Sequence, residues 1–341
     1  MIVSLITLTV SFLVTYFITP LFINYFNSIG LVNSDVHKKT KTIVANSGGI
    51  PVISGIVMGL FTYIALKTFI YKDATSLIEL FSAITSILII TFSGFLDDLN
   101  SKPQKYEGFT YKSGLKQWQK PLFTLPAVIP LMVINAGETT MSLPLLGLVN
   151  FGLLYPLVLI PLGIVGCANM VNLLGGFNGS EAGMGIIYTL SLGLYALYAH
   201  QNIAAIILLS TTVSLIAFLN FNFAPARILS GDSLTYALGG IVAVCAILGN
   251  MEKFALVTMS LFIIEWILKL RSLHDLKHFA TSLGHLDKKT MLITSKYDKV
   301  YSLTHIAMGK NGSTEKVIAV KLVALQILVA VIPWILFVKI V

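Results

Sequence analysis

Ten stretches of the chain, each close to a membrane thickness in length, consist almost entirely of apolar side chains. A helix of about 20 residues is about 30 Å long, which matches the hydrocarbon core of a bilayer. The chain is 56% hydrophobic and only 11% charged, too few polar residues to cover a water-soluble protein of 341 residues. We therefore expect an all-α, polytopic membrane protein that forms one integral membrane domain over residues 1–341. The expected spans are 2–25, 48–69, 77–96, 120–137, 149–168, 183–199, 203–222, 233–249, 254–270 and 319–338.

The positive charges lie almost entirely on one side of these expected spans. If residues 27–47 face the cytoplasm, 19 of the 23 Lys and Arg residues fall in or beside cytoplasmic loops. The positive-inside rule predicts this orientation, with both termini outside. The same asymmetry accounts for the net charge of +8 without a nucleic-acid partner, and it would attract anionic substrates to the cytoplasmic face of the bilayer.

The polar residues that are able to do chemistry gather on this expected cytoplasmic surface. Asp97 and Asp98 follow directly on an apolar run, where a charge is costly beside hydrocarbon and therefore indicates a functional site. The loop from Asn169 to Glu181 is rich in Asn and Gly, and another loop ends in Gly-Asp-Ser at 231–233. Carboxylate and amide oxygens are hard ligands for Mg²⁺, while lysines and Gly-rich backbone bind phosphates. The pattern predicts Mg²⁺-assisted phosphoryl transfer at the membrane surface.

Three motifs make the chain similar to the polyprenyl-phosphate N-acetylhexosamine-1-phosphate transferase family. They are Gly94-Phe-Leu-Asp97-Asp98, Asn169-x-x-Asn172-x-x-x-Gly176-x-Asn178-Gly179-x-Glu181 and Gly231-Asp232-Ser233. Bacterial members usually carry Asp at the positions of Gly175 and Asn178, so this variant resembles the eukaryotic dolichyl-phosphate branch and its archaeal relatives. The resemblance implies transfer of N-acetylglucosamine-1-phosphate from UDP-GlcNAc to a polyprenyl (dolichyl) phosphate, with release of UMP. That reaction would be the first membrane step of glycan assembly of the N-glycosylation type.

The resemblance also implies catalytic and metal-binding roles for individual residues. Asn172 and Asp232 match residues that hold the Mg²⁺, for which Mn²⁺ is the alternative ion. Lys120 matches a lysine that contacts phosphate, and Asp97 and Asp98 match the aspartate pair near the lipid phosphate. We expect direct attack by the lipid phosphate, with a covalent intermediate on Asp98 as the minority alternative.

Further residues match substrate-binding positions of the same family. Gly176 and Asn178 match a turn that recognises uracil, and Glu181 belongs to the same motif. Lys38 or Lys39 matches a basic residue of the first loop. His305 is the candidate for the family's histidine in the last cytoplasmic loop, although the arginines that flank this histidine in the eukaryotic branch are absent here.

Several alternatives stay open on the sequence alone. The nearest is a phospho-MurNAc-pentapeptide transferase, or a transferase for another UDP-hexosamine, in the same family. A secondary transporter would instead carry ionisable groups near the membrane midplane, with an internal repeat that we do not find. A non-catalytic scaffold is disfavoured by the complete set of Mg²⁺-type ligands, and a homodimer is left open.

Overall fold

The computed structural model describes residues 2–106, 109–143 and 147–338, and the chain is mostly helical. Seven of the described helices are long and apolar enough to cross a membrane. They are α1 (Ile2–Ser28), α2 (Gly49–Ala65) with η1 (Leu66–Ile70), α3 (Leu77–Leu99), η3 (Tyr155–Leu159) with α6 (Ile160–Leu173), α8 (Asn202–Asn222), α9 (Gly231–Leu248) and α13 (Glu315–Phe337). The expectation of a mainly helical chain with several membrane-length apolar helices is therefore confirmed.

The other three expected spans are helical as well, but two of them are divided into shorter helices. α7 (Ser180–Tyr198) is one continuous helix. The range 120–137 holds α4 (Gln119–Thr124), η2 (Leu125–Val128) and α5 (Ile129–Val133), which are short because three prolines each lack an N–H and crowd the preceding turn. The range 254–270 is shared by α10 (Glu252–Thr258) and α11 (Ser260–Leu276). The count of ten spans stays a prediction.

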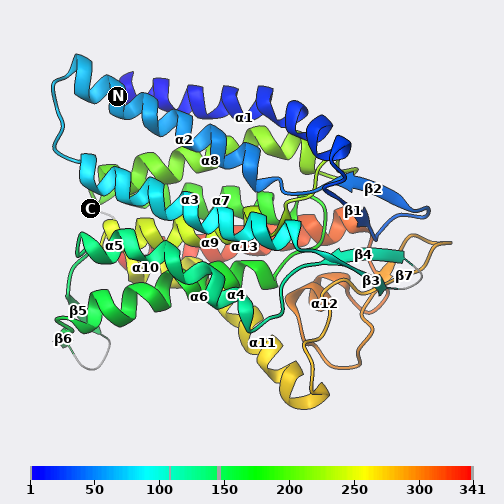
Figure 1. Cartoon of the computed structure of the whole chain (residues 1–341). Helices are drawn as coiled ribbons and strands as arrows, with labels where there is room; N and C mark the ends of the chain where they lie inside the picture. The colour runs from blue at the N-terminus through cyan, green and yellow to red at the C-terminus, as the bar shows by residue number, and fades with distance from the viewer. Residues whose placement is uncertain (1, 107–108, 144–146, 339–341) are drawn as a thin grey trace.

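The all-α expectation was wrong in one respect, because the described chain also contains short antiparallel hairpins. They pair β1 (Val32–Asp35) with β2 (Thr42–Ala45), β3 (Lys102–Tyr106) with β4 (Phe109–Ser113), β5 (Thr140–Leu143) with β6 (Gly147–Asn150), and β7 (His285–Leu286) with β8 (Ile293–Thr294). Figure 1 shows β1–β4, β7 and the short α12 (Leu303–Met308) at one end of the bundle. The β5–β6 hairpin lies at the opposite end, where α1 begins and α13 ends. We call the end that carries β1–β4 the loop end.

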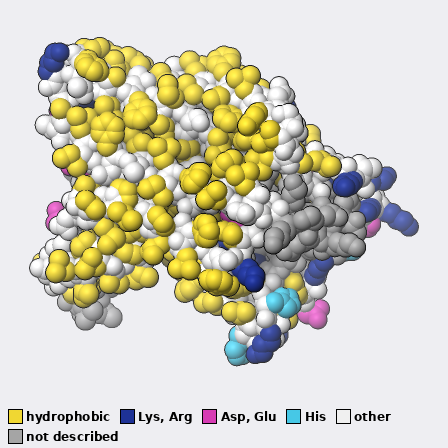
Figure 2. Space-filling model, in the orientation of Figure 1, with side chains coloured by type: hydrophobic (Ala, Val, Ile, Leu, Met, Phe, Trp, Pro, Cys, Tyr) yellow, Lys and Arg dark blue, Asp and Glu magenta, His cyan; other side chains and the backbone are white. Residues whose placement is uncertain are grey.

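The surface of the bundle fits a lipid environment. Figure 2 shows hydrophobic side chains over the helical part of the visible face, and most of the visible Lys and Arg side chains near the loop end. Phe17 on α1 and Leu328 on α13 are both 67% exposed, as are many other large apolar residues of the outer helices. Contiguous apolar surface of this kind is rare on a soluble protein and indicates contact with the membrane.

α9 lies at the centre of the bundle and organises it. Fifteen of its 18 residues are buried. Glycines let its neighbours approach closely: a Cβ on Gly94 of α3 would lie 2.3 Å from the Asp232 carbonyl oxygen, and a Cβ on Gly239 of α9 would lie 2.3 Å from that of Cys167 on α6. Small residues commonly allow such close approach between membrane helices. This packing brings α3, α6 and α9 together, so that the polar ends of all three meet at the loop end.

Candidate active site

A cavity of about 830 Å³ lies at the loop end of the bundle. Eight of the eleven predicted site residues line it: Asp97, Asp98, Lys120, Asn172, Gly176, Asn178, Glu181 and Asp232. They come from the end of α3, the start of α4, the end of α6, the α6–α7 loop and the starts of α7 and α9. Its volume lies in the range that pockets for small-molecule ligands occupy.

Lys120 forms the centre of a polar cluster in this cavity. Its Nζ lies 2.9 Å from Asp97 Oδ2 and 2.9 Å from Asp232 Oδ2. The Asn172 side chain is oriented so that its amide oxygen and its amide nitrogen both have hydrogen-bond partners. The oxygen accepts from Lys120 Nζ at 3.2 Å, and the nitrogen donates to Asp232 Oδ1 at 2.9 Å. The Tyr236 hydroxyl donates to Asp97 Oδ2 at 2.9 Å. Two carboxylates and one amide oxygen thus converge on a single cation.

The same three oxygen-bearing side chains form a donor set of the kind that Mg²⁺ prefers. The Lys120 ammonium places one positive charge where the oxygens of Asp97, Asp232 and Asn172 meet. The residues therefore fit a hard divalent cation by their chemistry.

Asp98 anchors the beginning of α9. Its Oδ1 accepts from Asn46 Nδ2 at 3.1 Å and from the Asp232 backbone N–H at 2.9 Å. Its Oδ2 accepts from Ser47 Oγ at 2.7 Å and from the Ser233 backbone N–H at 3.2 Å. The first N–H groups of a helix have no partner inside the helix, and here Asp98 supplies one for two of them. Both carboxylate oxygens are engaged, and their contacts fix the backbone of Asp232.

The loop between α6 and α7 makes a tight turn at the cavity. Gly176 has φ +99° and Gly179 has φ +84°, both in the left-handed region that favours glycine. Glu181 accepts from the Gly176 backbone N–H at 2.7 Å, which ties the first turn of α7 back to the loop. This bond helps to hold the turn in the wall of the cavity.

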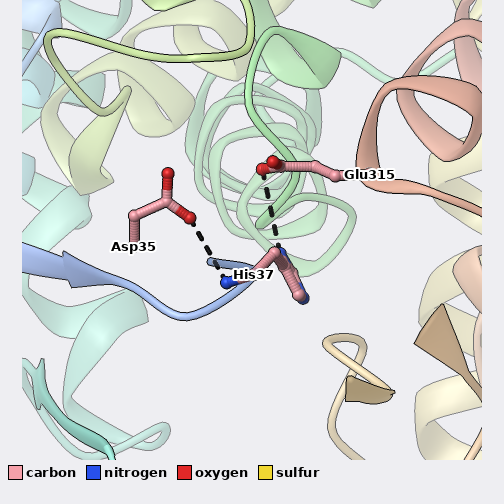
Figure 3. A group of neighbouring side chains, drawn as sticks. All are labelled: Asp35, His37 and Glu315. Atoms are coloured by element: carbon pink, nitrogen blue, oxygen red, sulfur yellow. Dashed lines mark hydrogen bonds and ion pairs between the residues drawn. The ribbon is translucent and has the colours of Figure 1, made fainter. Parts of the chain in front are cut away.

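A second polar cluster supports the same turn from behind. Asp35 Oδ2 accepts from Asn178 Nδ2 at 2.7 Å, and Glu315 Oε1 accepts from the Asn178 backbone N–H at 3.2 Å. Lys38 forms ion pairs with both carboxylates. Although burial opposes it, the charges of Glu315 and Asp35 raise the pKa of Lys38. Figure 3 shows Asp35 and Glu315 on either side of His37.

Three of the predicted site residues are not among those that line the cavity. Lys38 belongs to the cluster behind the turn, and Lys39 is exposed between β1 and β2. His305 on α12 is buried; its Nδ1 accepts from the Tyr301 backbone N–H at 3.3 Å, and its Nε2 donates to Thr281 O at 3.0 Å. Burial lowers the pKa of His305, in keeping with a neutral ring. His305 therefore stabilises the part of the cavity wall that contains Thr281.

That wall, formed by residues 279–283, was missed by the sequence analysis. Phe279, Thr281, Ser282 and Leu283 line the cavity. Four consecutive carbonyls of the segment each accept a side-chain hydrogen bond: Ala280 from Lys269, Thr281 from His305, Ser282 from Thr304, and Leu283 from His37. No local motif marks the segment, because its partners are spread from the first loop to α12.

The fold and the cavity define a multi-helix membrane protein with a lysine–carboxylate site at one end of the bundle. Residues 80–250 match the model of the family described as glycosyl transferase family 4. A protein of Saccharolobus solfataricus is 32% identical over 336 residues, covering 97% of this chain and 96% of its own. A protein of Sulfolobus acidocaldarius is 32% identical over 333 residues, covering 96% and 94%. Both carry the provisional name UDP-N-acetylglucosamine–dolichyl-phosphate N-acetylglucosaminephosphotransferase.

A more distant relative carries a different name. A phospho-N-acetylmuramoyl-pentapeptide-transferase of a Geobacillus species is 30% identical over 270 residues, covering 77% of this chain and 80% of its own. The chain therefore belongs to glycosyl transferase family 4, and the resemblance seen in its motifs is confirmed.

Proposed function

We propose that the protein transfers N-acetylglucosamine-1-phosphate from UDP-GlcNAc to a polyprenyl phosphate of the dolichyl type. The products are UMP and GlcNAc-diphosphate-polyprenol. The observation that carries the proposal is the Lys120 cluster, which places one ammonium among hard oxygen ligands in a cavity of a membrane protein. The relatives that align along nearly the whole chain carry this activity in their names, whereas the muramoyl relative aligns over 77% of it.

The cavity offers different surroundings for the two substrates. Leu162 and Val165 of α6 and Trp266 of α11 line its apolar part, and Leu162 and Trp266 are 64% and 45% exposed on the outside of the bundle. A polyprenyl chain can reach the site from the lipid along these residues. The turn at Gly176–Asn178 and the wall at 279–283 supply polar groups for the UDP-sugar.

The main chemical problem is to bring two anions together. A phosphate monoester has a second pKa of about 6, so the lipid phosphate is mostly dianionic near neutral pH and needs no base to attack. Its oxygen attacks the phosphorus that bears the sugar, a new P–O bond forms, and the bond to UMP breaks. Lys120 reduces the repulsion between the two phosphates and stabilises the charge that develops in the transition state.

Asp232 and Asn172, with Asp97 beside them, are the residues that would hold Mg²⁺, and Mn²⁺ prefers similar oxygen ligands. When bound, the ion would neutralise diphosphate charge and stabilise the leaving UMP. Asp98 keeps Asp232 in place through the backbone of α9. Because both oxygens of Asp98 already accept hydrogen bonds, direct attack by the lipid phosphate is favoured over a covalent intermediate on Asp98.

We also propose that the protein crosses the membrane ten times, with the cavity on the cytoplasmic face. The seven long apolar helices are completed by α7, by α4 to α5 and by α10 to α11. The loop end then holds most of the 23 Lys and Arg residues, as the positive-inside rule requires of cytoplasmic loops.

Purified protein with Mg²⁺, a panel of UDP-sugars and phosphorylated polyprenols tests the function by release of UMP. We expect UDP-GlcNAc to be used at least about tenfold better than UDP-GalNAc or UDP-glucose, a difference that one buried hydrogen bond can supply. Asp232→Ala is the control, and it should abolish turnover in folded, membrane-inserted protein. Turnover only with a muramoyl-pentapeptide donor would replace the proposal with the alternative in the same family.

A further inference from the structure

Three charged residues support Asn178, and we call them the Asn178 clamp: Asp35 at the end of β1, Lys38 three residues later, and Glu315 at the start of α13. Asp35 accepts from the Asn178 side-chain nitrogen, and Glu315 accepts from its backbone N–H. Lys38 bridges the two carboxylates and lies 2.8 Å from Asp35 Oδ2. The preceding loop residue is fixed as well, because Phe177 stacks on His37 with ring centroids 4.6 Å apart.

The two carboxylates of the clamp form, with His37, a group of the composition of a metal site, but the oxygens of both carboxylates are already engaged. Asp35, His37 and Glu315 offer ligand atoms within 4.8 Å of one another (Figure 3). All four oxygens of Asp35 and Glu315 already accept hydrogen bonds, from Lys38, from Asn178 and from the His37 backbone N–H. We interpret the cluster as a support for Asn178.

Asp35 decides which way the Asn178 amide faces. An ionised carboxylate only accepts hydrogen bonds, so the amide nitrogen, and not the amide oxygen, must face it. Turning the amide would bring its oxygen against the Asp35 carboxylate in a buried site, which is strongly unfavourable. Among the described residues none donates to Asn178 Oδ1, and Asn178 lines the cavity. The oxygen is therefore the side-chain atom that Asn178 can offer to a ligand.

We infer that Asp35 is a specificity-determining residue, which makes Asn178 present a hydrogen-bond acceptor to the nucleotide base and so selects uracil over cytosine. This inference rests on the proposed function, because it assumes that the base of the donor binds at the 176–178 turn. Uracil N3 carries a hydrogen and donates, whereas cytosine N3 carries a lone pair and accepts. An amide free to turn would serve either base, and the clamp removes that freedom.

The test measures binding of UMP and CMP to the full-length protein by titration calorimetry, which requires no transfer reaction. We expect the wild-type protein to bind UMP at least about tenfold more tightly than CMP, since the wrong base leaves buried polar groups unpaired. Lys38 bonds to the same Asp35 oxygen as Asn178, so an amide at position 35 would keep an acceptor there, and a side chain without polar atoms is needed. Asp35→Leu keeps the approximate size of the side chain and can neither donate nor accept. It should reduce the UMP-to-CMP preference to within about threefold, because the Asn178 amide can then turn. If Asp35 had only a structural role, its substitution would weaken the binding of UMP and of CMP equally.

Two further variants complete the experiment. Asp35→Asn combined with Asn178→Asp exchanges the two groups, keeps the net charge and leaves only acceptor oxygens at position 178, so the preference for UMP should return. Asp73→Leu is the matched control, because Asp73 also lies 2.8 Å from a lysine, Lys67, but belongs to the loop between η1 and α3. This control should leave the preference unchanged.

Several results would overturn the inference. They are equal affinity of the wild-type protein for UMP and CMP, no binding of either nucleotide, an unchanged preference in Asp35→Leu, and a double variant that does not regain the preference. The first, second and fourth results stay measurable if the single variant does not fold. Failure to release UMP from UDP-GlcNAc would instead overturn the proposed function, while the binding preference would still test the role of Asp35.

Discussion

Removal of the Asp98 carboxylate should destabilise the protein and inactivate it together. Asp98→Ala leaves four donors without their acceptor: the Asn46 amide, the Ser47 hydroxyl and the backbone N–H groups of Asp232 and Ser233. The two side chains can turn toward other partners, whereas the two backbone groups are fixed at the start of α9. At about 1–3 kcal/mol for each buried donor left unpaired, the backbone groups alone lower the free energy of unfolding by about 2–6 kcal/mol. Turnover should fall as well, because Asp232 lies in the helix turn that is released.

The free cysteines of the chain provide the assay. Cys245 is buried within α9, and Cys167 is partly buried on the neighbouring α6. A thiol-reactive fluorogenic dye, present while the protein is heated in detergent, therefore reports the opening of these helices. The unfolding midpoint of Asp98→Ala should fall by several degrees, and that of Asp98→Asn by less, because its amide keeps one acceptor oxygen. The exposed Asp298→Asn is the control and should leave the midpoint unchanged.

The comparison between stability and turnover decides the role of Asp98. An Asp98→Ala protein that loses turnover but keeps the wild-type midpoint would show that Asp98 acts on the substrate itself. The reasoning that makes Asp98 the anchor of α9 would then be refuted, and a covalent intermediate on this residue would have to be reconsidered.

Three other predictions concern the lysine, the buried histidine and the membrane topology. Lys120→Met keeps an unbranched apolar side chain but removes the ammonium, so kcat for UMP release should fall at least about 100-fold; a fall of less than tenfold would contradict the charge-neutralising role. His305 has its pKa lowered from 6.5 by burial, so the unfolded chain binds the proton more readily and stability should fall as the pH drops below about 6.5, by at most about 1.4 kcal/mol per pH unit. His305→Gln should show a shallower decrease of the thiol-dye midpoint between pH 7 and pH 5, and an unchanged pH slope would contradict this assignment. Cysteines introduced at Asn100 and Glu138 should be labelled from opposite sides of the membrane, and labelling from the same side would contradict the ten-span topology.

The apolar runs predicted most helices for a direct physical reason. In hydrocarbon an unpaired backbone N–H or C=O is too costly, so a long apolar segment must become a helix. Consecutive spans also alternate in direction, which is why the sequence could place Asp97, Asn172 and Asp232 on the same surface. The hairpins were missed because they lie outside the spans. None of their strands is longer than five residues, and no strict alternation of apolar and polar residues marks them.

Only the tertiary structure determined how the polar residues are partnered. Asp97 and Asp98 are neighbours in sequence, yet Asp97 contacts Lys120 while Asp98 supports the backbone of α9. Likewise, Asp35, Asn178 and Glu315 share no local pattern but meet beside one turn. The reason is that side chains on successive residues of a helix point in different directions, and their neighbours depend on which helices pack together. That packing follows from the close approach of α3 and α6 to α9 at Gly94 and Gly239, which no single segment of the sequence can specify.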